Sequence, residues 1–402
     1  MRVDCVAKLF TLKTRKQSRN LFSKSSGMKS GKITCTREEL DLGITLNGGQ
    51  SFRWVSLDNG AKYRGVFSGQ VWTLSQDENN LLYTLHSSSI QDDSTCIKVL
   101  KKYLNLDISL RDNIEKWSSS DPHLKKSCRS VSGVRILNQE TVENLFSFIC
   151  SSNNNIPRIS SMVEKMCKHF GKKICTVDKQ QYNDFPTIEA LSKPKVEALL
   201  REEGFGYRAA YIAKTAKKLK TLGGSEWLLG LCKANGASYS KAREELMTLP
   251  GVGPKVADCI CLMSLGHLEA IPVDTHIFQV ARANYMPHLE KQKTVTPKIH
   301  EEVSKHLREL WGPLAGWAQA IVFCAKISGN GDVSPNKKKL TEAMDAEGQS
   351  ALAVLPLLPA VLQIAPVRES PGLVIVAEKR AELVPHVQFG FGRANTYHLQ
   401  VE

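Results

Sequence analysis

One stretch, residues 241–278, constrains this chain more than any other: KAREELMTLPGVGPKVADCICLMSLGHLEAIPVDTHIF. Its apolar spacing predicts an amphipathic helix that ends at Leu249, a short Pro-Gly-Val-Gly turn, and a second helix that begins at about Pro254. Gly251 and Gly253 permit backbone torsions and a close approach that other residues forbid, and a proline suits a first helical turn. The pattern predicts two helices joined by a tight hairpin.

Backbone N–H groups left unpaired at such a hairpin, and at the start of the helix after it, attract an anion. We therefore interpret residues 241–265 as a helix-hairpin-helix that binds a nucleic-acid phosphate, a contact that reads no base sequence. The alternative is a plain helix–helix turn. Noncatalytic DNA-binding modules also carry the hairpin, so a second feature has to separate an enzyme from a module.

That second feature is the pair Lys255 and Asp274. Lys255 can be a plain phosphate contact, but at a helix N-terminus beside an apolar face its ammonium is disfavoured, which favours the neutral amine of a nucleophile. Asp274 closes a Pro-x-Asp element at 272–274 and is a good helix N-cap. A carboxylate there would also stabilise positive charge at the C1′ of a sugar whose glycosidic bond breaks. The two roles of the aspartate can coexist.

The charge of the chain supports a nucleic-acid partner. The 402 residues include 54 Lys+Arg against 40 Asp+Glu, a formal charge of +14, and this excess favours a polyanion. Residues 1–30 hold eight Lys or Arg and one Asp, a net +7, and we expect a basic disordered arm there. A mitochondrial transit peptide is the alternative interpretation of that arm.

The cysteines and the apolar stretches exclude other classes. The eleven cysteines include no CxxC pair, so zinc knuckles and a four-cysteine iron–sulfur loop are unsupported, and we expect no metal and no cofactor. The longest uncharged stretch, 348–367, contains three prolines, so we expect no membrane segment.

The periodicity of the chain divides it. Alternating aromatic and β-branched residues from Gln50 predict strands at 51–57, 62–69, 70–76 and 81–86, and after residue 96 apolar residues recur with helical spacing. We predict an α+β protein. Its expected parts are the arm at 1–30, an N-terminal antiparallel sheet domain at 31–135, a helical core at 136–327, and a linker and low-order tail at 328–402.

Six ordered blocks carry a resemblance to the helix-hairpin-helix DNA glycosylase superfamily and, within it, to the eukaryotic 8-oxoguanine DNA glycosylases. They are GGQSFRW at 48–54, LFSFICSSNNNIPRI at 145–159, GFGYRAAY at 204–211, LPGVGPKVADCICLMSL at 249–265, IPVDTH at 271–276 and WGPLAGWAQAIVF at 311–323. The resemblance implies an N-terminal antiparallel β-sheet domain of the TATA-binding-protein-like kind, packed on a mainly α-helical glycosylase core.

The resemblance also implies an activity: a bifunctional glycosylase and lyase for abasic sites that removes 8-oxoguanine, and related purines such as formamidopyrimidine-guanine, opposite cytosine in duplex DNA. Lys255 would attack C1′ to form a Schiff base that leads to β-elimination, and Asp274 would assist base departure. The implied protein is a monomer in base excision repair, located in the nucleus, with the mitochondrion as a candidate additional location.

The remaining site residues follow from the same resemblance. An enzyme that acts on a base in a duplex must extrude it and fill the space left behind. Tyr207 resembles the wedge that holds the duplex open and Asn153 the residue that fills the gap. Arg158 and Arg208 resemble contacts to the orphaned cytosine, and His276 resembles a phosphate contact.

The lesion itself would meet four residues. Gly49 resembles the glycine whose carbonyl accepts the N7–H that 8-oxoguanine has and guanine lacks. Cys259 and Phe323 resemble the two faces that sandwich the base, and Gln319 a contact to its pairing edge. Two other functions stay open at this stage: a catalytically silent DNA-binding module with the same hairpin, and a glycosylase for a different lesion.

Overall fold

The computed structural model describes residues 28–86 and 92–327, together with the strand backbones 374–377, 387–391 and 395–399. By internal contacts the chain divides into two units, residues 1–333 and 334–402. The first unit contains every predicted site residue.

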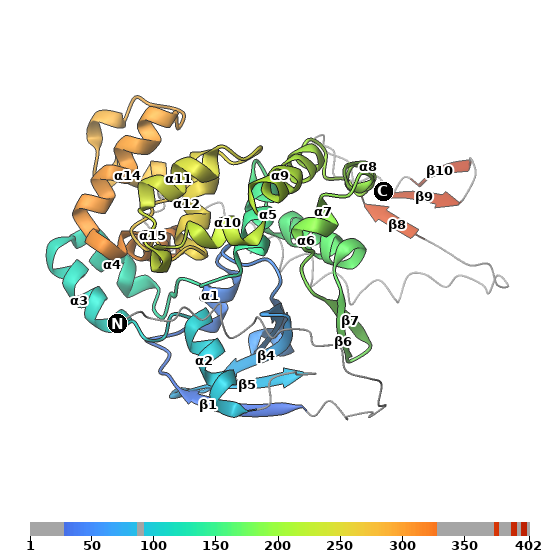
Figure 1. The fold of residues 1–402 in the computed structure, drawn as a ribbon, viewed down its shortest axis with the longest axis horizontal. Coiled ribbons are helices and arrows are strands. Elements are labelled where there is room, and N and C mark those ends of the chain that lie inside the picture. The colour runs from blue at the N-terminus through green and yellow to red at the C-terminus, as the bar shows by residue number, and fades with distance from the viewer. Residues whose placement is uncertain (1–27, 87–91, 328–373, 378–386, 392–394, 400–402) are drawn as a thin grey trace. The chain divides into compact units, whose positions relative to one another are not determined.

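An antiparallel sheet of five strands forms the N-terminal part (Figure 1), in the order β1-β5-β4-β3-β2. Its strands are β1 (Lys29–Thr34), β2 (Val55–Leu57), β3 (Lys62–Phe67), β4 (Gln70–Gln76) and β5 (Asn80–His86). In the register of the central strands Gly65 pairs with Trp72 and Trp72 with Leu85, which places the Trp72 side chain in the core with no exposed surface. Helices α1 (Leu42–Asn47) and α2 (Asp93–Tyr103) share the buried core of this sheet, whereas α3 (Leu110–Ser120) and α4 (Pro122–Ser130) pack into the core of the helical body that follows.

Two differences from the predicted sheet have physical reasons. β1 was not predicted, because in the segment KSGKIT only Ile33 is buried and the alternation is too weak to see. The strand predicted at 51–57 covers only Val55–Leu57, which pair with Lys62–Arg64 of β3, whereas residues 51–54 are all buried and have no partner strand among the described residues. Within that buried stretch the Arg53 guanidinium donates to the carbonyl of Asn183 at 2.5 Å and lies 3.4 Å from Glu143.

The rest of the first unit is a helical body with a single buried core, and the α+β fold is confirmed. Its principal elements are α5 (Thr141–Ser151), α6 (Ile156–Phe170), β6 (Lys173–Val177), β7 (Gln180–Asn183), α7 (Ile188–Leu191), α8 (Val196–Glu202), α9 (Arg208–Leu222), α10 (Ser225–Gly230), α11 (Tyr239–Met247), α12 (Pro254–Met263), α13 (Thr275–Asn284), α14 (Pro297–Trp311) and α15 (Ala315–Ile327). Figure 1 shows α11, α12, α14 and α15 grouped on the side away from the β6–β7 hairpin.

The small β6–β7 hairpin interrupts this helical body and was also not predicted. Its two-residue turn, Asp178 and Lys179, has φ of +49° and +66°, the left-handed pair that such tight hairpins use. Neither residue is a glycine or an asparagine, so the sequence carries no strong turn signal there.

The second unit contains three strands, β8 (Val374–Ala377), β9 (Val387–Phe391) and β10 (Asn395–Leu399), paired antiparallel in the order β10-β9-β8. They differ from the expectation of a tail without regular strands, and short β-branched runs such as VIVA favour them. Most of the expected tail, and residues 1–27 of the expected arm, lie outside the described residues, while Lys29 and Ser30 pair with β5.

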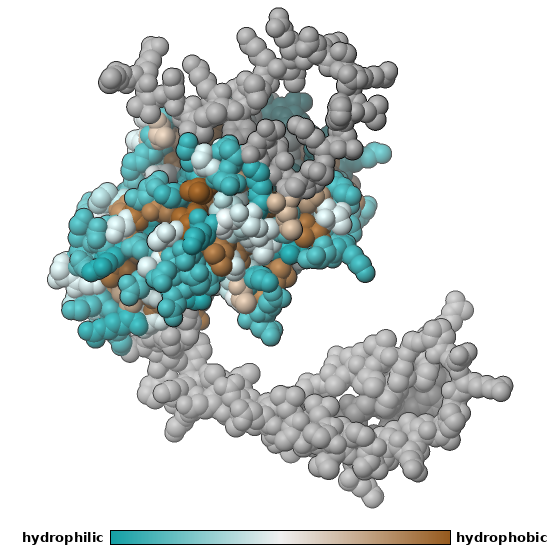
Figure 2. Space-filling model, turned by 90° about the horizontal axis from the view of Figure 1, so that it is seen from below, coloured by the Kyte–Doolittle hydropathy of each residue, from teal (hydrophilic) through white to brown (hydrophobic). Residues whose placement is uncertain are grey.

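The described part of the chain has one helical stretch, Pro297–Ile327, that is long and apolar enough to cross a membrane, and 61% of its most apolar window is buried inside the fold. It breaks at Gly312, where φ is +74°. The face of the first unit seen in Figure 2 is mostly hydrophilic, with apolar residues in small groups. We therefore interpret α14 and α15 as core helices.

Candidate active site

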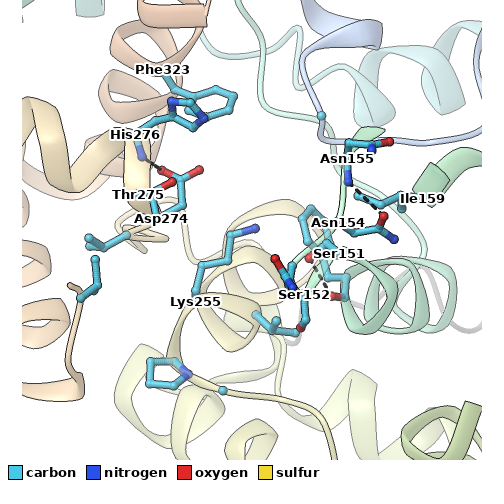
Figure 3. A pocket seen from close by; sticks show the side chains of 18 of the residues that line it. Ser151, Ser152, Asn154, Asn155, Ile159, Lys255, Asp274, Thr275, His276 and Phe323 are labelled. Carbon is cyan, nitrogen blue, oxygen red and sulfur yellow. Dashed lines mark hydrogen bonds between the residues drawn. The ribbon is translucent and has the colours of Figure 1, made fainter. Parts of the chain in front are cut away.

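A cleft of about 960 Å³ opens within the helical body, and Gly49 and Phe52 of the N-terminal part complete its lining. It is lined by Gly49, the residues from the end of α5 into α6, the hairpin and first turn of α12, the residues 273–276 that lead into α13, the start of α14, and Phe323 and Ile327 of α15. Figure 3 shows Lys255 reaching into this space from below, with Asp274 and His276 on one side and Ser151, Ser152 and Asn154 on the other. Segments far apart in the sequence thus converge on one cavity.

The predicted helix-hairpin-helix is present, as α11, the turn 248–253 and α12. Gly251 has a φ of +82°, and a β-carbon there would lie 2.8 Å from the Tyr211 side chain. Two side chains of α9 hold the turn: the Thr215 hydroxyl donates to the carbonyl of Pro250 at 2.7 Å and the Lys218 ammonium to that of Thr248 at 2.6 Å. The hairpin therefore has a fixed shape.

The first turn of α12 is left open at its N-terminus. Gly253 is the N-cap residue, no side chain caps it, and Pro254 occupies the first turn. The N–H groups of the residues that follow are therefore available to an anion, with the positive end of the helix dipole behind them. Because no atom of the described residues lies within 4 Å of the place that a β-carbon on Gly253 would take, a phosphate can approach the backbone closely.

Lys255 extends from this first turn into the cleft, and its ammonium lies 5.2 Å from the centre of the Phe148 ring. Such a contact is one that a cation makes with an aromatic face. Attack on a sugar carbon requires the neutral amine of this side chain. One turn further along α12, burial raises the pKa of the Cys259 thiol to about 11, although the nearby Lys255 lowers it.

Asp274 is the N-cap of α13. Its Oδ1 accepts hydrogen bonds from the backbone N–H groups of His276 and Ile277, both at 2.9 Å (Figure 3). Both bonds end on one oxygen, so within the described part of the chain Oδ2 stays available to a ligand in the cleft. The capping role predicted for this aspartate and a role in the cleft are thus compatible in one side chain.

Of the four residues predicted to contact the damaged base, two line the cleft. Gly49 does so with a φ of +78°, and Phe323 does so with its ring at 5.9 Å from that of His276, edge to face. Cys259 and Gln319 share helices α12 and α15 with Lys255 and Phe323, but they are only 2% and 6% exposed and do not line the cleft. Contact with a base would require both to be uncovered.

The residues predicted to meet the orphaned cytosine and to fill or hold open the duplex gather around the α5–α6 loop and the start of α9. Asn153 lines the cleft in a left-handed conformation with φ of +48°, in the loop between α5 and α6. Arg208 donates to the carbonyls of Ser152 and Asn153 and stacks on the Tyr207 ring at 4.5 Å.

Two further contacts tie this group together. The Tyr207 hydroxyl donates to the Ser152 carbonyl at 3.1 Å, and Arg158 donates to the carbonyl of Gly204 at 3.3 Å. Tyr207 is about half exposed, whereas Arg208 is buried and its Nε has no partner among the described residues. The structure brings together Asn153 of the α5–α6 loop, Arg158 of the first turn of α6, and Tyr207 and Arg208 at the start of α9.

Phe148 and His300 are among the cleft residues that sequence reasoning missed. Phe148 lies in a continuous apolar run and His300 on the apolar face of an amphipathic helix, so the pattern of each fits a core residue. Among the described residues no group of three or more His, Cys, Asp or Glu side chains could hold a metal ion.

Two family models match the chain. Residues 32–145 match that of the 8-oxoguanine DNA glycosylase N-terminal domain, and residues 146–313 match that of the HhH-GPD superfamily base excision DNA repair proteins.

Curated relatives and solved structures agree with these matches. An N-glycosylase/DNA lyase of Saccharomyces cerevisiae is 40% identical over 335 residues, which covers 75% of this chain and 87% of the relative. One of Arabidopsis thaliana is 38% identical over 299 residues, covering 73% and 80%. An 8-oxoguanine glycosylase/lyase of Clostridium acetobutylicum, solved with duplex DNA containing cytosine opposite to 8-oxoguanine, superposes with a TM-score of 0.63 at 29% identity, covering 73% of this chain and 93% of that one.

Proposed function

Since the chain belongs to the N-glycosylase/DNA lyase family within the HhH-GPD superfamily, we propose that it excises 8-oxoguanine opposite cytosine from duplex DNA and then cleaves the strand. The observation that carries the proposal is the convergence of Lys255 and Asp274 on one cleft (Figure 3). A lysine nucleophile and a carboxylate beside it are the two groups that such chemistry requires.

The first step replaces the glycosidic bond. The damaged nucleotide leaves the duplex and enters the cleft. The neutral Nζ of Lys255 donates its electron pair to C1′, the C1′–N9 bond breaks, and its electron pair and a proton go to the departing base. Positive charge develops on the sugar as the bond breaks, and the Asp274 carboxylate opposes it.

The second step cleaves the strand. The lysine and C1′ form an imine after the sugar ring opens, and loss of a proton from C2′ expels the 3′ phosphate by β-elimination. Water then hydrolyses the imine and releases the lysine. The open N-terminus of α12, with its unpaired N–H groups, holds a backbone phosphate near the reacting sugar.

Discrimination rests on two groups of residues. We assign the carbonyl of Gly49 to the N7–H of 8-oxoguanine, because a guanine would leave that acceptor unpaired. We assign Arg158, Arg208, Asn153 and Tyr207 to the orphaned cytosine and the space around it. In support, the four lie together at the edge of the cleft, where the arginines now donate to backbone carbonyls that a base could replace.

Borohydride trapping tests the proposal, on a duplex with one 8-oxoguanine opposite cytosine. The wild-type protein should form a covalent adduct, and Lys255→Gln should form none while it still binds the duplex. Lys305→Gln is the matched control, since that lysine is 69% exposed on α14 and should trap as the wild type does. If the wild type binds the duplex but yields neither adduct nor free base, the protein is a silent DNA-binding module.

A change of the opposite base tests specificity. Adenine in place of cytosine should slow excision sharply in the wild type and much less in Arg208→Ala. Equal wild-type rates on the two duplexes would exclude the cytosine roles given to Arg158 and Arg208. A different preferred lesion in the same assay would leave the lysine chemistry intact and change the substrate.

We further propose that the protein works in the nucleus, with the mitochondrion as the alternative destination. The basic arm at residues 1–30 supports an address signal. Imaging of a fluorescent fusion with and without residues 1–30 separates the two compartments.

A further inference from the structure

Helix α9 presents two exposed polar side chains that the reaction described above does not use. Tyr211 is 39% exposed, and its hydroxyl makes no hydrogen bond with any of the described residues. Lys214 follows three residues later and is also exposed. In the described part of the chain, its ammonium meets neither a carboxylate nor a hydrogen-bond acceptor. Both groups are therefore available to a partner.

Tyr211 lies beside two points that the proposed function places on DNA. Its ring packs edge to face on the ring of Tyr207, the proposed wedge, with the centroids 5.8 Å apart. Its Cβ, Cγ and Cδ2 lie 2.8 to 2.9 Å from the place that a β-carbon on Gly251 would take, at the tip of the hairpin. A duplex that is opened by Tyr207 and held at the hairpin has to span the surface between them, and that surface includes Tyr211.

The helical spacing places Lys214 on the same face of α9. Tyr207 already has helical torsions, with φ of −60° and ψ of −22°, so the spacing extends back to it. Successive residues of an α-helix turn by about 100°, so Tyr207, Tyr211 and Lys214 lie within about 60° of one another around the helix axis. Lys214 lies about 10 Å further along this axis than Tyr207. The three side chains form one line on the surface.

The charge of α9 suits a phosphate backbone. Its sequence, RAAYIAKTAKKLKTL, contains several cations and no Asp or Glu. Two of the cations already donate to backbone carbonyls, Arg208 to those of the α5–α6 loop and Lys218 to that of the hairpin. Lys214 keeps its charge for another partner. Since the hairpin beside this face also attracts an anion, the surface is complementary to a polyanion.

We propose that Tyr211 and Lys214 form a further DNA-binding surface, the α9 strip, which contacts backbone phosphates of the duplex in addition to the phosphate held at the hairpin. This inference rests on the proposed function. The Tyr211 hydroxyl donates to one phosphate oxygen, and the Lys214 ammonium pairs with another. Contacts of this kind fix the register of a protein on the duplex and read no base sequence. The α9 strip holds the duplex in place while Tyr207 opens it.

A matched pair of charge variants tests the strip. Lys214→Gln and Lys220→Gln each remove one positive charge from the exposed surface of the same helix. Lys220 lies about 120° around the helix from Lys214, away from the line of tyrosines. Lys214→Arg restores the charge at the strip. The Kd is measured over a range of salt concentrations, on a duplex that holds an uncleavable abasic analogue.

The salt dependence of the Kd reports the lost phosphate contact. One neutralised phosphate contributes about 0.9 to the slope of log Kd against log salt concentration, so Lys214→Gln should lower the slope by about 0.9 and weaken binding about fivefold at about 0.15 M salt. Lys214→Arg should keep the wild-type slope. Lys220→Gln should change the slope by less than about 0.3, because a charge that contacts no phosphate is screened by salt. Equal slopes for Lys214→Gln and Lys220→Gln overturn the proposal.

Tyr211→Phe tests the uncharged half of the strip. The variant keeps the ring against Tyr207 and Gly251 and removes only the hydroxyl. Loss of one hydrogen bond should raise the Kd about threefold to tenfold, and the salt slope should stay unchanged because no charge is lost. A wild-type Kd in Tyr211→Phe overturns the hydroxyl contact.

Replacement of single phosphates by neutral methylphosphonates locates the contact. The distance along α9 and the length of a lysine side chain place the partner of Lys214 within about five nucleotides of the lesion. At one such position the replacement should weaken binding by the wild type and by Lys220→Gln but not by Lys214→Gln, which has already lost the interaction. If no position within this range behaves so, the proposal is overturned.

These measurements separate the α9 strip from the proposed function, because binding requires no removal of a base. A protein that shows the expected slopes and excises nothing keeps the strip and rejects the proposed function. A protein that excises 8-oxoguanine, but in which both lysine variants have the same slope, keeps the proposed function and rejects the strip.

Discussion

The glycine at the tip of the hairpin, Gly251, offers a sharp test of how this fold builds its phosphate site. The perturbation is Gly251→Ala. Two effects oppose the alanine: the backbone there has a φ of +82°, and the new β-carbon would lie 2.8 to 2.9 Å from three carbons of Tyr211. Tyr211 cannot yield freely, because its ring also packs edge to face on Tyr207 at 5.8 Å.

The expected cost follows from the two effects together. A left-handed backbone costs an L residue about 1–2 kcal/mol and overpacking about 1–3 kcal/mol, so Gly251→Ala should lower the free energy of unfolding by about 2–5 kcal/mol. Urea denaturation measures this value. Tyr211→Ala in the same chain removes the overlap with Cγ and Cδ2 but keeps the β-carbon at 2.8 Å, so it should recover part of the packing cost and leave the backbone cost. The double variant should then lose less stability than the two single effects added together.

Gly253→Ala is the matched control, two residues away in the same turn. Gly253 has a φ of −95° and nothing within 4 Å of the added β-carbon, so stability should change by less than about 0.5 kcal/mol. DNA affinity should fall nonetheless, because the methyl group would point at the phosphate site. If Gly251→Ala proved as stable as Gly253→Ala, the close packing of the hairpin against α9 would not be what gives it its shape.

Two further outcomes follow from the site. Asp274→Ala should lower the excision rate and, because the helix cap is lost, also lower the free energy of unfolding by about 1 kcal/mol. Asp274→Asn should keep the cap and lose excision alone. Equal unfolding midpoints for the two variants in thermal denaturation would contradict the capping role. Burial raises the pKa of Cys259 to about 11, so its thiol stays protonated at pH 8 and iodoacetamide should label it far more slowly than a free cysteine. Mass spectrometry of the native protein measures the labelling rate. Labelling as fast as that of a free thiol would show that the pocket opens readily.

The hairpin and the N-cap could be predicted from sequence because each depends on a few adjacent residues. Gly251 and Asp274 take their conformations from local torsions and local hydrogen bonds, and spacing along the chain reports those directly. The sheet was harder to predict. Residues 51–54 alternate in sequence as a strand does, but they are all buried and form no strand. Tertiary contacts that a local pattern does not contain decide such cases.

The candidate site shows the same division. The spacing around Cys259 and Gln319 predicts that both lie in helices, and both are buried. Their distance from the cleft depends on how α12 and α15 pack. His300 lines the cleft because α14 packs beside Val273, 27 positions away in the chain. The position of a backbone amide opposite a distant side chain leaves no mark on residue spacing.

The two roles of Asp274, as a helix cap and as a group in the cleft, limit which substitutions can be accepted at this position during evolution. In many enzymes a catalytic group is a burden on the fold, and variants that lose it gain thermal stability. Here one carboxylate oxygen caps a helix while the other faces the cleft, so a change to a residue that cannot cap a helix loses both properties. A screen for heat-resistant variants would therefore retain an N-capping residue at position 274. In a cell, a change to alanine would reduce the amount of protein as well as its turnover, and the two deficits would have to be measured apart.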